Sequence, residues 1–322
     1  MLWGGTVGEG NRNDSVGSEF RELVGEITEL LGKPNLSDFF PAMERFDLQG
    51  IQKRMKGLLE RFDRMFARII EEKRTEGGEK EGAKDMLEFM LKLQEEEAEG
   101  NVAFTMTHVK ALLMDMVVGG TDTTSNTVEW ALAEMMNKPE TLRRAQEELE
   151  HVVGKNGIVE ESHLPELHYL HLVIKEVLRL HPALPLMVPH CPSKPCTVGG
   201  YTIPEGSRVF INVWAIHRDP SIWENPSEFK PERFSDTSRK WDFSGNDFSY
   251  FPFGSGRRIC AGIAMAERMS SYTLASLLHS FEWKLPEDAG LDLTEKFGIV
   301  MKKAKPLIAI PTPRLDNLDL YS

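Results

Sequence analysis

Residues 253–262 read FGSGRRICAG and hold the most chemically suggestive cysteine of the chain. Glycines allow unusual backbone angles and a close approach of the backbone to a flat ligand. Cys260 stands where an apolar helical pattern begins, and the N–H groups of a helix N-terminus stabilise a thiolate and can donate hydrogen bonds to its sulfur. The neighbouring Arg257 and Arg258 are suited to pair with a carboxylate of a bound cofactor. For such a cysteine taken alone, a buried structural role beside a glycine turn would be the simpler interpretation.

Outward from this stretch, the chain is mostly helical in pattern. Apolar residues recur at three- and four-residue spacing, and short runs of β-branched and aromatic residues beside turn signals favour strands. The predicted helices cover Leu48–Glu72, Thr107–Met136, Pro139–Val153, Leu164–Leu180 and Ala261–His279. The predicted strands lie at Val198–Tyr201, Val209–Val213, Glu282–Leu285 and Leu307–Ile310. We therefore predict a fold that is mainly α with a small β portion.

We expect one domain over residues 1–322, made of four parts. Residues 1–75 are a helical N-terminal part, and residues 76–84, rich in Gly and Glu, are a flexible linker. Residues 85–181 are a helical core. Residues 182–322 hold the β portion, the loop of residues 253–262 around Cys260 (the cysteine loop) and the last helix.

Composition excludes some functions. The net charge of −12 argues against nucleic acid as a partner, because phosphate binding needs clustered Lys and Arg. Three cysteines cannot complete a disulfide framework, which points to a reducing compartment or to one cysteine kept for chemistry. The chain has no run of 18 or more apolar residues, so we expect no transmembrane helix and a chain that by itself is soluble and cytosolic.

Two further patterns lie in the predicted helices. Residues 119–124 read GGTDTT, and two glycines inside a helix cost about 1 kcal/mol each against alanine, so they need a reason. Hydroxyls there can bond to backbone carbonyls and bend the helix, or a hydroxyl and a carboxylate can relay protons. Glu176 and Arg179 lie three residues apart on one face, which for a surface pair would be worth well under about 1 kcal/mol.

The order Phe-x-x-Gly-x-Arg-x-Cys-x-Gly in residues 253–262 resembles the haem-binding signature of the cytochrome P450 family. The resemblance implies that Cys260 is the thiolate ligand of the haem iron, where it favours O–O cleavage. It also implies that Phe253, Gly254 and Gly262 shape the haem loop and that Arg258 contacts a haem propionate. His190 is the expected second propionate partner. Ala261 departs from the proline common at its position and resembles one branch of plant microsomal members.

The same resemblance assigns roles to the other patterns. Glu176 and Arg179 match the family's Glu-x-x-Arg, and residues 231–234 (PERF) supply Arg233, so these three residues are expected to form a network that supports the cysteine loop. Asp122 and Thr123 fall on the oxygen-activation motif as carboxylate and hydroxyl of a proton relay. The substrate pocket implied by the resemblance is lined by Leu112, Met116, Gly119, Ala183, Leu184, Met187, Gly298 and Ile299, which fit an apolar substrate and equally fit plain core packing.

The implied activity is hydroxylation of a small apolar substrate with O2 and electrons from NADPH, delivered by an NADPH–cytochrome reductase flavoprotein. Short runs such as residues 32–35 (GKPN) and 38–41 (DFFP) resemble the plant group that contains geraniol hydroxylases and ferruginol synthases, which favours a terpenoid substrate. Full-length family members sit on the cytosolic face of the endoplasmic reticulum membrane. Against them, this chain is expected to be truncated before its anchor helix, first strands and early helices.

Two alternatives stay open at this point. One is a haem-thiolate isomerase or dehydratase, against which the Asp122–Thr123 pair speaks because such enzymes can dispense with a proton relay. The other is a non-catalytic, truncated haem-binding remnant, since a thiolate site depends on dry, hydrogen-bonded surroundings.

Overall fold

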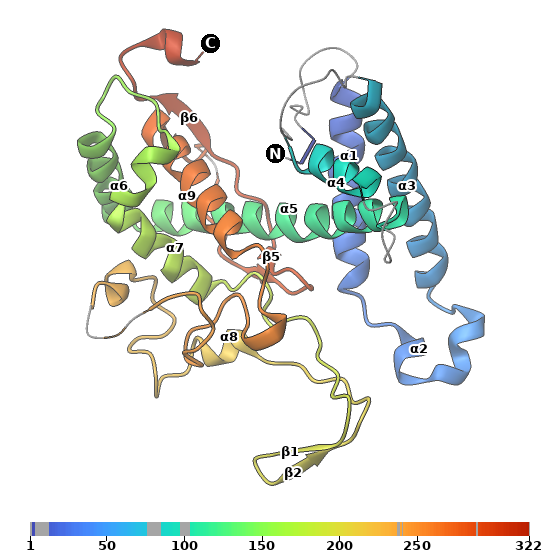
Figure 1. Cartoon of the computed structure of the whole chain (residues 1–322). Helices are drawn as coiled ribbons and strands as arrows, with labels where there is room; N and C mark the ends of the chain where they lie inside the picture. The colour runs from blue at the N-terminus through green and yellow to red at the C-terminus, as the bar shows by residue number, and fades with distance from the viewer. Residues whose placement is uncertain are drawn as a thin grey trace. The chain divides into compact units, whose positions relative to one another are not determined.

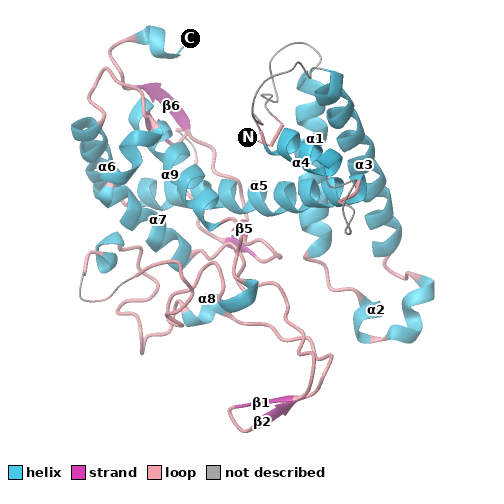
Figure 2. Cartoon of the chain, viewed as in Figure 1, coloured by secondary structure: helices cyan, strands magenta, loops and turns pink. Residues whose placement is uncertain are grey.

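The computed structural model describes residues 2–3, 13–75, 85–96, 104–236, 239, 241–287 and 289–321, and helices predominate in it (Figures 1 and 2). The α-helices are α1 (Asn13–Leu31), α2 (Leu36–Phe39), α3 (Ile51–Thr75), α4 (Met86–Glu96), α5 (Met106–Asn137), α6 (Pro139–Val152), α7 (His168–Leu180), α8 (Val213–Ile216) and α9 (Ile263–Ser280). Short 3-10 turns are η1 (Pro41–Phe46), η3 (Glu161–Glu166), η4 (Pro231–Phe234), η5 (Gly256–Arg258) and η6 (Leu318–Tyr321).

The described part of the chain holds three small antiparallel sheets of two strands each. They pair β1 (Cys196–Val198) with β2 (Tyr201–Ile203), β3 (Phe281–Lys284) with β6 (Ile310–Pro313), and β4 (Glu295–Lys296) with β5 (Lys302–Lys303). The β1–β2 turn is Gly199–Gly200, both at positive φ, as a tight two-residue hairpin requires. The predicted class, mainly α with a small β portion, is confirmed.

The chain divides into two compact units, Met1–Asp122 and Thr123–Ser322, and the boundary falls inside α5. In the first unit α1 packs against α3, and Val109, Leu113 and Val117 of α5 join the same apolar core. Arg61 of α3 forms ion pairs with Glu22 and Glu26 of α1. The linker predicted at residues 76–84 lies outside the described residues.

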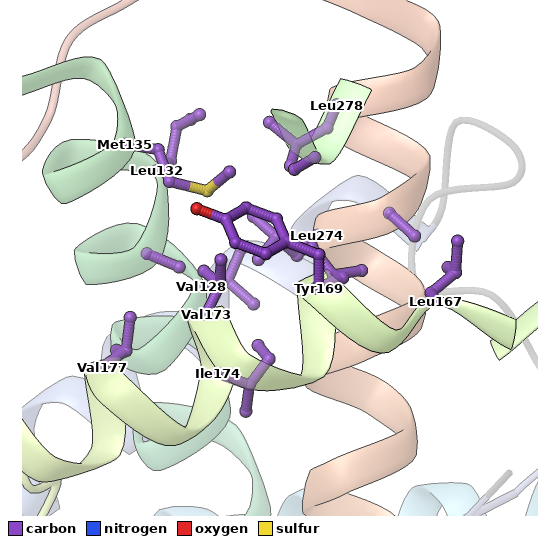
Figure 3. Packing of buried hydrophobic residues seen from close by; sticks show 14 of the residues in the cluster. Val128, Leu132, Met135, Leu167, Tyr169, Val173, Ile174, Val177, Leu274 and Leu278 are labelled. Atoms are coloured by element: carbon purple, nitrogen blue, oxygen red, sulfur yellow. The ribbon is translucent and has the colours of Figure 1, made fainter. Parts of the chain in front are cut away.

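The core of the second unit lies among the C-terminal half of α5, α6, α7 and α9, and it positions the candidate site. Figure 3 shows side chains of α5, α7 and α9 around Tyr169. The labelled residues of this core are Val128, Leu132, Met135, Leu167, Tyr169, Val173, Ile174, Val177, Leu274 and Leu278. Because α7 and α9 share this core, the loop that leads into α9 is tied to the helix that carries Glu176.

The predicted helices are confirmed with small shifts of their ends, two of the predicted strands are wrong, and the strand predicted at Leu307–Ile310 overlaps β6 only at Ile310. Val209 forms only an isolated bridge with His190, and Val213 begins α8 because the Asn212 side chain accepts the Ala215 N–H at 3.0 Å. Val198–Tyr201 is a hairpin turn because of its two glycines. The helix predicted from Leu164 starts at His168, since Pro165 lies in the preceding 3-10 turn.

Among the helices of the described residues, none is both long enough and apolar enough to cross a membrane.

Candidate functional site: the cysteine loop and its supports

The loop before α9 places Cys260 at the surface of the second unit. The Cys260 N–H donates to the Phe253 carbonyl at 3.0 Å, which closes the loop, and the Gly262 N–H donates to the Cys260 sulfur at 3.3 Å. Gly254 and Gly256 have φ of +81° and +67°, a left-handed conformation that glycine adopts without strain. The result is an exposed thiol whose sulfur already accepts one backbone hydrogen bond.

The sequence-predicted residues of this loop therefore come together. Phe253 and Gly254 are half-buried, whereas Arg258 and Gly262 are exposed. A Cβ placed on Gly254 would lie 3.9 Å from the Met187 sulfur, so the loop after α7 reaches the cysteine loop.

The three charged residues expected to form a network also meet. Arg179 donates to both carboxylate oxygens of Glu176, at 2.7 and 2.9 Å, and Arg233 donates to one of them at 2.9 Å. Glu176 and Arg179 are fully buried, and the Lys230 N–H donates to the same carboxylate at 2.8 Å. A buried carboxylate is stable only when its charge and lone pairs are matched in this way.

Arg179 extends this network to backbone carbonyls of a neighbouring segment. Its guanidinium donates to the carbonyls of His217, Pro226 and Glu228 at 2.7, 2.8 and 3.2 Å. It also lies over the ring of Trp223, with 5.2 Å to the ring centre. The arginine thus binds α7 to the segment of residues 217–228, which precedes the cysteine loop in the chain.

Aromatic residues fill the space between this network and the loop. Trp223, Phe234 and Tyr250 form a buried cluster against which Trp241 and Phe243 pack. The Tyr250 hydroxyl donates to the Lys175 carbonyl of α7 at 2.9 Å. Burial raises the pKa of Tyr250 well above its usual value, and the charge of Glu176 adds to the effect. The hydroxyl therefore stays protonated, and the ring packs as a neutral group.

The predicted proton-relay residues lie in the middle of α5. Asp122 and Thr123 are both half-buried and belong to different units, Asp122 ending the first and Thr123 beginning the second. The hydroxyls of Thr121 and Thr127 donate to the carbonyls of Val117 and Thr123, at 2.7 and 2.9 Å. The helix stays α-helical through Gly119 and Gly120, so the glycines and the hydroxyls that bond to backbone carbonyls do not break it.

The predicted substrate residues form two groups. Ala183, Leu184 and Met187 lie in the loop after α7, and the Ala183 carbonyl accepts the Met301 N–H at 2.9 Å, which joins this loop to the segment of Gly298 and Ile299. Leu112, Met116 and Gly119 belong to the first unit. Met187 has φ of +53°, an uncommon conformation for a bulky residue that marks local strain.

His190, the expected second propionate partner, is exposed. Its backbone forms the bridge to Val209, with both hydrogen bonds at 2.8 Å. This bridge holds the backbone of His190 in position.

The sequence model of the Cytochrome P450 family matches residues 7–310. The chain belongs to the cytochrome P450 family. The flavonoid 3',5'-hydroxylase of Solanum melongena is 44% identical over 306 residues, which cover 94% of this chain and 59% of that protein. Flavonoid 3',5'-hydroxylase 2 of Petunia hybrida is 45% identical over 307 residues, covering 95% of this chain and 60% of that protein. The P450 chain thus spans about three fifths of the length of these relatives.

A solved structure supports the same fold. A zebra fish cytochrome P450 determined with abiraterone superposes with a TM-score of 0.77 at 26% sequence identity, covering 98% of this P450 chain and 68% of the other. The predicted cytochrome P450 fold is therefore confirmed.

In cytochrome P450 proteins a cysteine thiolate holds the haem iron, and the cysteine loop of this chain fits such a group. Its sulfur is exposed and carries a backbone N–H donor at 3.3 Å, the kind of contact that tunes a thiolate ligand. Ala261 and Gly262 beside it are small and exposed, so neither of these two residues blocks a flat ring system. The exposed Arg258 offers a guanidinium for a carboxylate of the group.

Several residues that join distant segments of the second unit were not predicted. His181 lies between Glu134 and Glu295, with each ring nitrogen 2.8 Å from a carboxylate oxygen, and its ring stacks on Trp130 at 3.8 Å. His217 accepts the N–H of Phe251 just before the cysteine loop, and the Gly245 carbonyl accepts the Ser255 hydroxyl within it. Glu134 and Trp130 lie four residues apart in a helical pattern, which placed them on one face, but no local signal indicated their partners.

Proposed function

We propose that this chain carries the haem-binding and proton-handling residues of a haem-thiolate monooxygenase. The observation that carries the proposal is the exposed Cys260 sulfur just before α9, which accepts the Gly262 N–H at 3.3 Å. When bound, haem supplies an iron centre that activates O2, with electrons that come from NADPH through a reductase flavoprotein.

The chain's own residues have separate tasks in this proposal. Cys260 binds the metal as a thiolate, and Arg258 and His190 pair with the carboxylates of the cofactor. Asp122 and Thr123 pass protons at the carboxylate and the hydroxyl. Glu176, Arg179 and Arg233 keep the cysteine loop in place, a structural task that belongs to cofactor retention.

For the substrate, we propose a small apolar compound of the flavonoid type. The relatives named above are flavonoid hydroxylases at 44 and 45% identity, which favours an aromatic, phenolic substrate over the terpenoid expected from the sequence resemblance. Apolar side chains at Leu184 and Ile299, together with Met187, suit such a flat ring system.

The first experiment records the reduced, carbon-monoxide-bound difference spectrum of residues 1–322 expressed with a haem supply. We expect a red-shifted Soret band, because a thiolate pushes electron density onto the iron, and we expect Cys260→Ala to abolish it. Cys191→Ala is the matched control, since Cys191 is also an exposed cysteine and should leave the band intact.

Because the relatives are longer, the same pair is measured in a chain extended with the part of the Petunia relative that this chain does not cover. A band that survives Cys260→Ala, or that is missing from both versions, contradicts the assignment of Cys260. Titration of the haem-loaded protein with a flavonoid and with geraniol then tests the substrate class through the spin-state change in the Soret region.

A further inference from the structure

The cysteine loop is tied to the rest of the second unit at Phe251. The Phe251 N–H donates to Nε2 of His217 at 3.2 Å, in a fully buried contact. The Phe251 carbonyl accepts the Gly254 N–H at 3.0 Å, and the Phe253 carbonyl accepts the Cys260 N–H at 3.0 Å. A short series of hydrogen bonds therefore leads from the imidazole of His217 to the backbone of the cysteine.

His217 is itself held on several sides. It has no solvent exposure and follows α8, where its N–H donates to the Val213 carbonyl at 2.9 Å. Its carbonyl accepts Arg179 at 2.7 Å, and its ring lies 5.4 Å from that of Tyr250, centre to centre. The residue thus connects the buried Glu176–Arg179 pair with the start of the cysteine loop.

The hydrogen bond from Phe251 requires a bare lone pair on Nε2, so the ring is neutral and carries its proton on Nδ1. Burial, followed by the charge of Arg179, lowers the pKa of His217 to about 3, which keeps this tautomer in place at neutral pH. A neutral imidazole accepts the Phe251 N–H and adds no positive charge beside the ion pair of Glu176 and Arg179.

We propose that His217 is a positioning residue for the cysteine loop, which it holds by accepting the Phe251 N–H. This role deepens the proposed haem-thiolate function and rests on it. Without the acceptor, the buried N–H of Phe251 has no partner and the loop loses its link to Arg179, so Cys260 no longer keeps one position.

Two substitutions separate the hydrogen bond from the bulk of the ring. His217→Gln places an amide oxygen near the position of Nε2 and can still accept, whereas His217→Phe keeps an aromatic ring and cannot. We expect amide hydrogen exchange of Phe251 to be about tenfold faster in His217→Phe, the usual size of one lost hydrogen bond, and close to wild type in His217→Gln.

The second readout is the carbon-monoxide difference spectrum of the same proteins loaded with haem. We expect His217→Phe to shift part of the haem from the red-shifted band to an unshifted one, and His217→Gln to keep the shifted band. His279→Phe is the matched control, since His279 is also buried, lies at the far end of α9 and bonds to the Gly157 carbonyl. It should change neither readout.

The outcomes distinguish this inference from the proposed function. If the shifted band is missing from wild type in both the short and the extended version, the proposed function is overturned, whatever the variants do. A wild-type chain with the band, whose His217→Phe variant matches it in Phe251 exchange and in spectrum, overturns only the role of His217. Equal damage from His279→Phe would also overturn it, because the effect would then be general destabilisation.

Discussion

Gly245 is a single residue on which the shape of the cysteine loop depends. Its φ is +71°, and a Cβ at this position would lie 2.4 Å from the Gly254 carbonyl oxygen and 2.9 Å from the Ser255 Cα. The Ser255 hydroxyl donates to the Gly245 carbonyl at 2.6 Å, which holds the two segments at that distance. Only glycine allows both the backbone conformation and the close approach.

We therefore expect Gly245→Ala to lower the free energy of unfolding by about 3 kcal/mol, because it adds an overlap with the loop backbone to the cost of a left-handed alanine. Gly199→Ala is the matched control: its φ is +57°, and its Cβ would meet nothing within 4 Å. That variant should lose about 1 kcal/mol. Denaturant unfolding measures both, and equal losses would contradict the steric argument.

Among the elements, α7 shows how a helix can carry charge into a core. Its buried side includes Val173, Ile174 and Val177, and Glu176 and Arg179 stand among these apolar residues with no exposure. In α6, by contrast, Arg143 and Glu147 form a pair that is exposed on both sides. The two helices therefore hold ion pairs of similar spacing in opposite surroundings.

This contrast predicts the effect of removing one charge from each pair. Glu176→Gln leaves the buried Arg179 and the partly buried Arg233 without a counter-charge and should lower the free energy of unfolding by about 3–5 kcal/mol. Glu147→Gln should change it by no more than about 0.5 kcal/mol, because solvent screens that pair. The comparison uses thermal or denaturant unfolding of the whole chain, and a loss below about 1 kcal/mol for Glu176→Gln would refute the buried-pair argument.

At the scale of the whole molecule, contacts between distant segments hold the second unit together. His181 follows α7 and meets Glu134 of α5 and Glu295 of β4, and Arg218 reaches the same Glu295 at 2.8 Å. Burial raises the pKa of Glu295, but the hydrogen bond of His181 and the charge of Arg218 outweigh it, so the net pKa is below its usual value. Glu295 thus stabilises the fold above about pH 4.3, the ordinary pKa of Glu, and loses that effect in acid.

Acid should also act on the whole molecule through His217. In the unfolded chain its pKa is about 6.5, whereas in the fold burial and the charge of Arg179 lower it to about 3, so between these values the unfolded state binds more protons. Stability therefore falls as pH falls below about 6.5. This one group should remove about 2 kcal/mol between pH 7 and pH 5.

His217→Gln has no proton to bind in that range, so its free energy of unfolding should change by about 2 kcal/mol less than that of wild type over the same interval. Urea unfolding at pH 7 and pH 5 measures the difference. Parallel pH dependence in the two proteins would show that His217 is not buried as a neutral ring.

Local patterns in the sequence determined most of the helices and the composition of the cysteine loop. Apolar spacing placed α3, α5, α6 and α9 within a few residues of their observed ends, because such spacing depends on the 3.6-residue repeat of each helix alone. The family signature in residues 253–262 likewise lies in one continuous stretch. The strands were predicted less well, because a strand depends on a partner segment as well as on its own residues. Residues 209–213 are of types that favour strands, yet only Val209 pairs, in one bridge.

Only the tertiary structure decided which distant residues support the loop. His217 and Gly245 contact the loop or the residues just before it from two segments far apart in sequence, and nothing in the local pattern of either segment indicates its partner. The physical reason is that a buried hydrogen bond or a steric fit is a property of two surfaces, and its strength depends on the water that packing excludes. The sequence by itself determined that Cys260 stands at a helix start in a glycine loop; packing decided what holds that loop.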